Sequence, residues 1–297
     1  CLRSRRRPSG GPSDSESPGL IDDEPRMHET PFPIHETGPF QYNDEGPDDA
    51  PLPPIVLLHG MLGDLSNWVD TVEALSNQGH RVLAPVLPVY DFPLSETGVP
   101  RLTEYIREFV TTLELGSVVL VGNSLGGHVA LLYALDHPET VHAMVLSGSS
   151  GIYETTMGSS FFRRQDREFI KERTEMTFYD PSHATEDLVD EMLEIVNDRP
   201  RAFRLLKFAR SADEETVTEQ LPRLDMPALL VWGRDDIITP PEVAEEFQAR
   251  MPSARLEFID KCGHAPMIEH PGTFNQLTLG FLERLGEEAP LRSPSGP

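Results

Sequence analysis

Residues 118–127, VVLVGNSLGG, decide the fold that we expect for this chain of 297 residues. The apolar, β-branched run at 118–121 predicts a strand, and the apolar residues at 129–135 predict a helix directly after it. Between them lies the pattern Gly-x-Ser-x-Gly, in which the serine occupies a sharp turn from strand to helix. The glycines let the backbone turn without a clash at Cβ. We therefore predict that the Ser124 hydroxyl projects above the edge of a sheet.

Strand and helix patterns alternate on both sides of this turn. Apolar strands are predicted at residues 55–58, 81–87, 117–122, 141–146, 228–232 and 255–259, and helices at 68–76, 102–115, 242–251 and 274–285. Such alternation is typical of a parallel sheet with helices on both faces. Residues 33–45 are expected to add antiparallel edge strands. The predicted fold class is therefore α/β.

The chain divides into a core and several additions. Residues 1–30 are rich in Pro, Gly, Ser and charge, which predicts a disordered N-terminal arm, and residues 289–297 predict a disordered tail. The core is expected at 31–151 and 223–288. Residues 152–222 lack a strand pattern and show helical periodicity at 161–179, 184–197 and 200–212. This insertion is predicted to form a helical cap, or lid, over Ser124.

The charge is strongly negative, with 49 acidic and 25 basic residues and a formal net charge of −24. A diffuse negative field repels nucleic acid and anionic membranes. We therefore expect a small-molecule substrate as the partner, no nucleic acid and no membrane. The acidity suggests a halophile-like surface and a cytoplasmic location, with a lipid anchor on Cys1 as the alternative. Two cysteines without a C-x-x-C spacing argue against a cysteine-bound metal, and no metal is predicted. The oligomeric state is left open.

A serine hydroxyl needs a base to accept its proton and a third group to orient that base. Of ten histidines, His264 is the candidate base because it lies in a loop directly after the predicted strand 255–259. The orienting acid should come from another strand end, between the serine and the histidine in the chain. Asp236 follows the strand 228–232 and is preferred to Asp235, which is expected to face solvent. The predicted triad is therefore Ser124, Asp236 and His264.

An oxyanion formed at the attacked carbonyl needs two N–H donors. One is the backbone amide of Leu125, directly after the serine. The second candidate is the amide of Met61, in the loop after strand 55–58. Gly60 would allow the substrate to approach this loop, and His59 is expected to support the loop rather than to react.

Four motifs together resemble the signatures of the α/β-hydrolase superfamily. They are Leu57-Leu58-His59-Gly60, Gly122-Asn123-Ser124-Leu125-Gly126-Gly127, Trp232-Gly233-Arg234-Asp235-Asp236 with Thr239-Pro240, and Cys262-Gly263-His264-Ala265-Pro266. The resemblance covers about residues 35–286. It implies a mostly parallel eight-stranded sheet flanked by helices, a helical cap inserted after the sixth strand, and hydrolysis through an acyl-enzyme without a cofactor. A serine nucleophile sets aside the dehalogenases and epoxide hydrolases of the superfamily, which use aspartate.

Within the superfamily the substrate is open between an ester and a carbon–carbon bond. Gly122-Asn123-Ser124 and the cap resemble the meta-cleavage-product hydrolases, which cut dienoate ring-fission products. Those enzymes commonly have tryptophan after the catalytic histidine, whereas this chain has Ala265-Pro266. Ala265-Pro266-Met267 and the loop Gly63–Trp68 look more like those of carboxylesterases. We therefore expect a small carboxylic ester as the substrate, with dienoate hydrolysis and acyl transfer as alternatives.

The cap is expected to contribute to the substrate pocket. Its aromatic residues Phe161 and Phe162 could line an acyl pocket above the serine or hold the cap to the core. Arg199, Arg201 and Arg204 are expected mainly to be solvated or to pair with acidic groups on the helices, and could instead pair with a substrate carboxylate, as a cap arginine does in the carbon–carbon hydrolases. The predicted pocket residues are His59, Gly60, Asn123, Phe161, Phe162 and Arg201.

Overall fold

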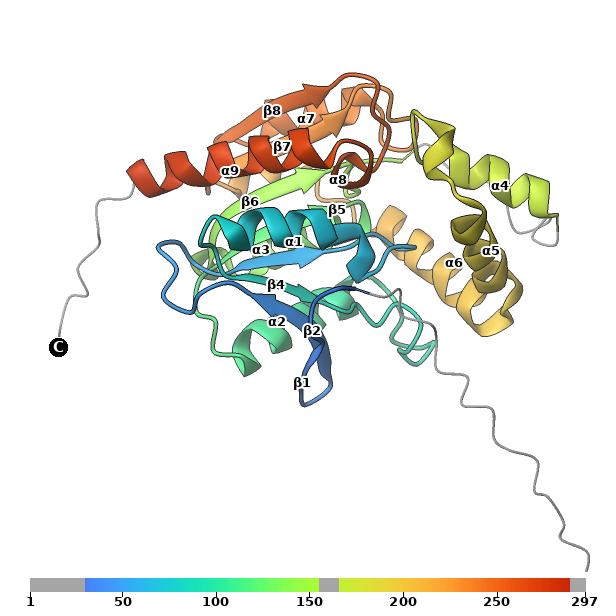
Figure 1. The fold of residues 1–297 in the computed structure, drawn as a ribbon, viewed down its shortest axis with the longest axis horizontal. Coiled ribbons are helices and arrows are strands. Elements are labelled where there is room, and N and C mark those ends of the chain that lie inside the picture. Colours follow the sequence, from blue (N-terminus) through green and yellow to red (C-terminus); the bar gives the residue numbers. More distant parts are fainter. Residues whose placement is uncertain (1–29, 155–165, 289–297) are drawn as a thin grey trace, which may run out of the picture.

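The computed structural model describes residues 30–154 and 166–288 (Figure 1). These residues contain one eight-stranded sheet with the order β1-β2-β4-β3-β5-β6-β7-β8. Its strands are β1 (His35–Thr37), β2 (Phe40–Glu45), β3 (Ile55–Leu58), β4 (Val82–Pro85), β5 (Val118–Asn123), β6 (Val141–Ser147), β7 (Ala228–Gly233) and β8 (Ala254–Ile259). Strands β3 to β8 are parallel, and β1 and β2 form an antiparallel edge. The predicted α/β fold is confirmed.

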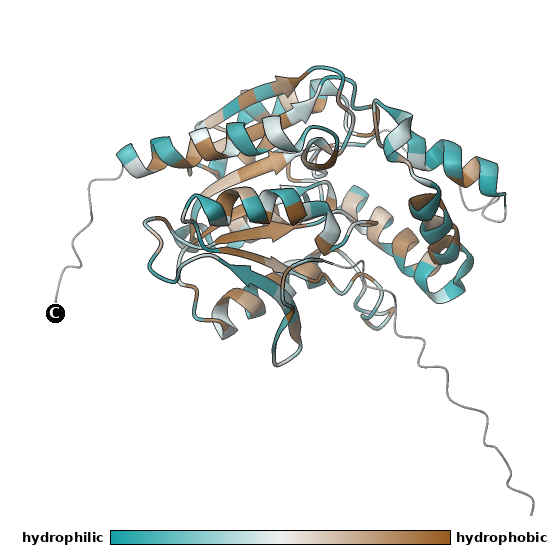
Figure 2. Ribbon diagram, in the orientation of Figure 1, coloured by the Kyte–Doolittle hydropathy of each residue, from teal (hydrophilic) through white to brown (hydrophobic). Residues whose placement is uncertain are grey.

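Helices cover both faces of this sheet (Figure 2). The helices are α1 (Val69–Asn77), α2 (Val99–Thr112), α3 (Leu125–Asp136), α4 (Arg167–Glu175), α5 (Glu186–Asn197), α6 (Arg199–Glu214), α7 (Pro241–Arg250), α8 (Pro266–Glu269) and α9 (Pro271–Glu288), with 3-10 turns η1 (Leu65–Trp68), η2 (Pro138–Thr140), η4 (Pro181–His183) and η5 (Leu221–Arg223). Alternate strand residues point to opposite faces. Leu57 and Val121 therefore pack with α1 and α9 in one apolar cluster, whereas Leu58 and Leu120 pack with α2, α3 and α7 in the other.

The carboxyl ends of the parallel strands meet at one edge of the sheet, and this edge carries all four sequence motifs. Helices α4, α5 and α6 follow β6 in the chain and lie beyond this edge in Figure 1. Several hydrogen bonds join this part of the chain to the core. Arg204, for example, donates one to the carbonyl of Phe92 at 2.9 Å, and the Ser211 hydroxyl accepts one from Val99 N–H at 3.0 Å. The predicted arm and tail fall almost wholly outside the described residues.

One helix starts differently from the prediction. The helix expected at 68–76 is preceded by η1, in which Trp68 is fully buried. Asp64 accepts a hydrogen bond from Ser66 N–H at 2.8 Å, and Asn67 accepts one from Asp64 N–H at 3.0 Å. This reciprocal cap starts the chain turning before the apolar period of α1 begins.

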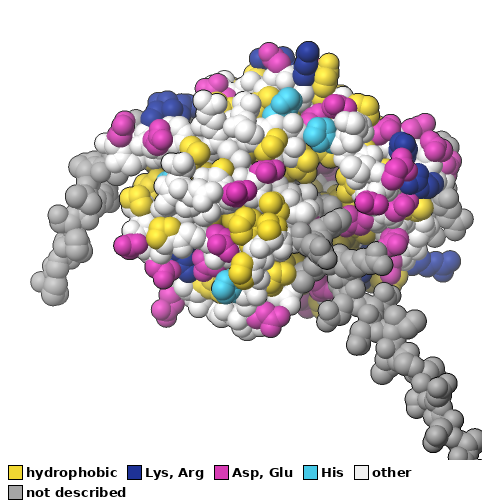
Figure 3. Space-filling model, in the orientation of Figure 1, with side chains coloured by type: hydrophobic (Ala, Val, Ile, Leu, Met, Phe, Trp, Pro, Cys, Tyr) yellow, Lys and Arg dark blue, Asp and Glu magenta, His cyan; other side chains and the backbone are white. Residues whose placement is uncertain are grey.

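Acidic side chains are spread over the visible face of the molecule rather than gathered at one place (Figure 3). Of the helices that the structure describes, none is long and apolar enough to cross a membrane.

Candidate active site

Ser124 occupies a strained turn between β5 and α3. Its backbone angles are φ 53° and ψ −118°, in a region that residues with a Cβ rarely adopt. Three hydrogen bonds hold this conformation: Ser124 N–H donates to the Ser147 carbonyl at 3.0 Å, and the Ser124 carbonyl accepts from His128 N–H at 3.1 Å and from Ser150 N–H at 3.2 Å. A Cβ on Gly126 would overlap the carbonyl of Leu58, so only glycine lets α3 pack this closely on β3. The half-buried Ser124 therefore stands at the sheet edge, where the sequence predicts it.

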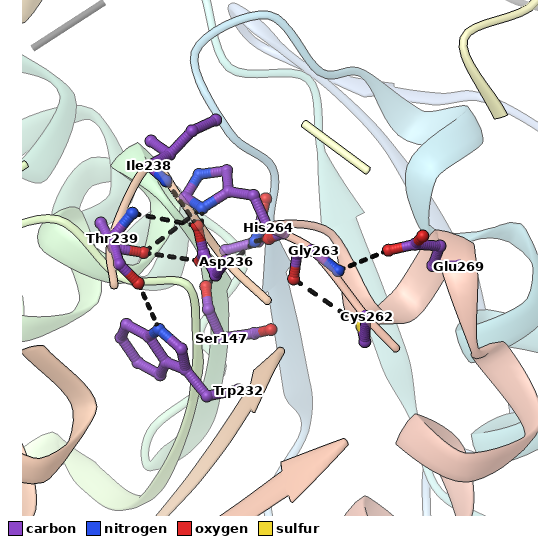
Figure 4. Close-up of polar contacts among 10 residues, drawn as sticks. Ser147, Trp232, Asp236, Ile238, Thr239, Cys262, Gly263, His264 and Glu269 are labelled. Atoms are coloured by element: carbon purple, nitrogen blue, oxygen red, sulfur yellow. Dashed lines mark hydrogen bonds and ion pairs between the residues drawn. The ribbon is translucent and has the colours of Figure 1, made fainter. Parts of the chain in front are cut away.

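His264 and Asp236 form a buried pair (Figure 4). The His264 Nδ1 lies 2.9 Å from Oδ2 of Asp236, and both residues are almost fully buried. Asp236 also accepts hydrogen bonds from the backbone of Ile238 at 2.8 Å, from the backbone of Thr239 at 3.0 Å and from the Thr239 hydroxyl at 2.8 Å. An ionised carboxylate can only accept, so the proton of neutral His264 sits on Nδ1 and Nε2 is the nitrogen able to accept a proton. Asp235 is exposed, as expected.

The charge of Asp236 tunes His264. Burial works to lower the pKa of the His264 imidazole, but the negative charge of Asp236 and its hydrogen bond raise it, and Glu154 raises it further. The net direction is upward from the ordinary histidine value. The site therefore stabilises the imidazolium that forms when the histidine accepts a proton.

The His264 ring is placed across the end of β6, between the strands that carry the serine and the acid. A Cβ on Gly148 would lie 2.8 Å from Nδ1 of His264, and Gly148 has a φ of +51°. The side-chain amide of Asn123 donates to the carbonyls of Ser147 at 3.0 Å and His264 at 2.9 Å. These contacts bring the histidine loop to the turn at Ser124. Within the described residues no hydrogen bond yet joins Ser124 to His264, and such bonds often form only with substrate bound.

The loop after β3 comes close to the serine. A Cβ on Gly60 would lie 3.4 Å from the Cβ of Ser124, so the amide of Met61, the next residue, is near the serine. Leu125 is the first residue of α3, and its N–H precedes the first intrahelical hydrogen bond. That these two amides form an oxyanion hole stays a prediction from the sequence.

His59 supports this loop. Its Nε2 accepts a hydrogen bond from Leu87 N–H at 3.1 Å, and its Nδ1 lies 2.8 Å from the Gly60 carbonyl. The two partners fix the neutral tautomer with the proton on Nδ1. Burial lowers the pKa of His59, which favours the same neutral form. His59 therefore has the supporting role expected from the sequence.

The other residues predicted to line the pocket differ in their surroundings. Asn123 is buried and its side-chain amide donates to backbone carbonyls, so it holds the histidine loop, and its place in a substrate pocket stays a prediction. Phe161 and Phe162 lie outside the described residues. Arg201 is half-buried in α6, with its guanidinium 5.6 Å from the centre of the Tyr90 ring.

Three residues of the site were missed as functional residues by sequence reasoning. Thr239 bonds Asp236 through both its backbone and its hydroxyl, and its place in the Thr239-Pro240 motif was the available signal. Gly148 follows β6 directly and could have been found from its place at the strand end. The Glu269 carboxylate accepts from Gly263 N–H, six residues away, and from Asp180 N–H, 89 residues away, so no local pattern marks it.

Comparison with known proteins defines the class. The chain belongs to the alpha/beta hydrolase fold family, whose model matches residues 53–271. A 2-hydroxy-6-oxononadienedioate/2-hydroxy-6-oxononatrienedioate hydrolase from Burkholderia vietnamiensis is 32% identical over 265 residues, which are 82% of this chain and 90% of the relative. A 2-hydroxy-6-oxo-6-phenylhexa-2,4-dienoate hydrolase from Burkholderia cepacia is 27% identical over 262 residues, 81% of this chain and 90% of the relative.

A solved structure agrees on the fold. MGS-MChE2, an alpha/beta hydrolase enzyme from the metagenome of lagoon sediments at Mar Chica, Morocco, is 37% identical with a TM-score of 0.70. The match covers 84% of this chain and 98% of that chain.

These relatives contradict the ester substrate expected from the sequence, because both curated hydrolases are named for dienoates rather than esters. The structure explains the error. Ala265 and Met267 are buried in the apolar cluster beside α9, and Leu65 and Trp68 of the loop that suggested an esterase are buried in the same cluster. The packing of the core explains these residues, and they do not indicate which bond is cleaved.

Proposed function

We propose that this chain hydrolyses a carbon–carbon bond beside the ketone of a 2-hydroxy-6-oxo-dienoate, with Ser124 as nucleophile, His264 as base and Asp236 as the residue that orients the base. The observation that carries the proposal is the 27–32% identity, over 81–82% of the chain, to hydrolases named for such compounds. The buried His264–Asp236 pair and the strained turn at Ser124 support it.

The chemistry follows from the substrate class. The 2-hydroxyl proton first moves to the carbon beside the ketone. That carbon becomes a CH₂ group, attached to a carbon–carbon double bond that is conjugated with a new carbonyl at position 2. Ser124 Oγ then attacks the 6-oxo carbon while Nε2 of His264 takes its proton, and the amides of Met61 and Leu125 stabilise the oxyanion.

The carbon–carbon bond then breaks in the direction that the conjugation favours. The electron pair of this bond is delocalised onto the oxygen at position 2. That oxygen takes the proton from His264, and the fragment leaves as a 2-hydroxy-dienoate. Water, activated by His264, cleaves the acyl-enzyme and releases a carboxylic acid. The sum is one substrate and one water giving two products.

We assign recognition of the substrate carboxylate to Arg201. A planar guanidinium binds a carboxylate through two parallel hydrogen bonds. Arg201 lies near the start of α6, stacked on Tyr90, and the adjacent Arg204 holds α6 to the loop that carries this tyrosine. In this proposal residues 152–222 act as the cap, and the cap supplies the cation that the substrate needs.

A direct assay tests this function. The protein is incubated with 2-hydroxy-6-oxo-6-phenylhexa-2,4-dienoate, and loss of the conjugated chromophore is followed together with formation of the carboxylic acid. We expect turnover that disappears in Ser124→Ala, with a kcat/KM above that for p-nitrophenyl butyrate. Folded protein that is labelled by a fluorophosphonate but turns over neither this compound nor the nonadienedioate would refute the proposal.

We also propose that the acidic surface is an adaptation to a high-salt cytoplasm. Screening by salt reduces the repulsion among carboxylates spread over the surface. Unfolding curves at low and at molar salt test this idea, and greater stability at low salt would contradict it.

A further inference from the structure

Glu269 is a buried acid next to the predicted triad that the proposed mechanism does not use. It lies at the end of α8 and is 8% exposed. Its Oε2 accepts a hydrogen bond from Gly263 N–H at 2.6 Å, and its Oε1 accepts one from Asp180 N–H at 2.7 Å. Both are short, charge-assisted bonds, which are stronger than those between neutral groups. Figure 4 shows the first of them, directly beside His264.

The two amides belong to segments far apart in the sequence. Gly263 precedes His264 in the loop after β8, and Asp180 lies between α4 and η4. The same segments meet again through the His264 backbone, whose N–H donates to the Thr177 carbonyl at 2.8 Å. A Cβ on Gly263 would lie 2.6 Å from that carbonyl oxygen, so the two backbones are in direct contact.

We propose that Glu269 is a positioning residue for catalysis: it ties the His264 loop to the segment 177–180 and so holds the imidazole between Ser124 and Asp236. The proposal rests on the triad of the proposed function but not on its substrate. Glu269 contacts neither the imidazole ring nor the serine in the described contacts, and it acts through the backbone of Gly263.

A carboxylate is required because both partners are donors. Each oxygen accepts from a different N–H, whereas an amide side chain offers one oxygen and one NH₂ group. In Glu269→Gln the NH₂ group must face either Gly263 N–H or Asp180 N–H, which leaves a buried donor unpaired and pushes one segment away.

The test compares Glu269→Gln with the wild type and with Glu245→Gln, an exposed position on α7 that serves as the control. We expect kcat for the dienoate to fall about 10- to 100-fold, because small displacements of a catalytic group have effects of this size, with KM changed by less than about twofold. Glu245→Gln should behave as the wild type. If Glu269→Gln does not fold, Glu269→Asp replaces it, since the shorter side chain cannot reach both amides.

Two further readouts need no dienoate. The first is the pKa of His264, measured by NMR with an assignment from His264→Asn. Asp236 and Glu154 are the charged groups that face His264, and loosening the contact with Asp236 should lower that pKa. The second is the rate at which a fluorophosphonate labels Ser124, which should fall with kcat.

The outcomes separate the two proposals. Unchanged labelling rate and unchanged His264 pKa in folded Glu269→Gln would overturn the positioning role, and a lowered melting temperature alone would show a purely structural one. Wild-type protein that is labelled but does not cleave the dienoate would refute the substrate and leave the Glu269 readouts interpretable.

Discussion

The orientation of Asp236 makes the substitution Asp236→Asn a sharp test of the predicted triad. Oδ1 of Asp236 accepts from two backbone amides, those of Ile238 and Thr239. In the asparagine variant these two donors select the carbonyl oxygen at that position. The NH₂ group is then forced toward Nδ1 of His264, where it must donate. Nδ1 becomes the acceptor, the imidazole proton moves to Nε2, and the base facing Ser124 is lost.

The size of the effect follows from this tautomer change. The analogous substitution in a serine protease lowers kcat by about 10⁴, which corresponds to about 5.5 kcal/mol of transition-state stabilisation. Because both backbone bonds are retained, we expect Asp236→Asn to fold with the wild-type architecture. Steady-state kinetics with the dienoate, or the rate of fluorophosphonate labelling, measures the loss.

The neighbouring aspartate is the matched control. Asp235 is exposed, and Asp235→Asn removes the same charge one residue away, so we expect activity within about twofold of the wild type. Less than a tenfold loss in folded Asp236→Asn, or equal losses in both variants, would refute the assignment of Asp236 as the orienting acid.

Four further predictions follow from single contacts. Because Asp236 raises the pKa of His264 and the base must be neutral, the acidic limb of the kcat/KM profile should lie above pH 6.5, and a limb below that value would contradict the pairing. Gly148→Ala should lower kcat at least about tenfold, because φ at this position is +51° and the new Cβ would lie 2.8 Å from Nδ1 of His264. Steady-state kinetics of the folded variant measure this loss. Burial lowers the pKa of His128 to about 4, so the folded protein favours the neutral imidazole. The resulting contribution to the free energy of unfolding is fully present above pH 6.5, and it should fall by about 3 kcal/mol on acidification to pH 4. Denaturant titrations of the wild type and His128→Gln measure this, and equal pH slopes would exclude the contribution. Finally, Arg201→Gln should raise KM for the dienoate about tenfold or more with kcat less affected, whereas an unchanged KM would remove Arg201 from carboxylate recognition.

The sheet could be predicted because its signals are local. Ile55–Leu58 and Val118–Asn123 are buried on both faces, and such strands appear in the sequence as continuous apolar runs. The chain order of serine, acid and histidine then selects Asp236 and His264, because each follows a strand at the same edge of the sheet. The 3-10 turn η1 could not be predicted in this way, because it begins at the side-chain hydrogen bonds of Asp64 and Asn67 and not at an apolar period.

The rest of the site could not be predicted, because it depends on contacts between distant residues. Asn123 sits beside the serine in sequence, yet its side chain turns inward to the carbonyl of His264, 141 residues away. Glu269 and Asp180 are 89 residues apart. The substrate was misjudged for a related reason: Ala265 looked like a specificity signal, and only the fold shows that it is 3% exposed and packed in the core.

Asp236 and His264, the acid and the base of the predicted triad, are therefore held in different ways. Three of the four hydrogen bonds to Asp236 come from residues 238 and 239, so its orientation is set within one turn of the chain. The His264 loop is held by Thr177 and Asn123, which come from other parts of the chain, and through Gly263 by Glu269, which is itself bonded to Asp180. A substitution that shifts the segment after α4 should consequently displace the base and leave the acid in place. Residues of the helical segment that never contact the substrate can thus alter kcat through the backbone of the histidine loop.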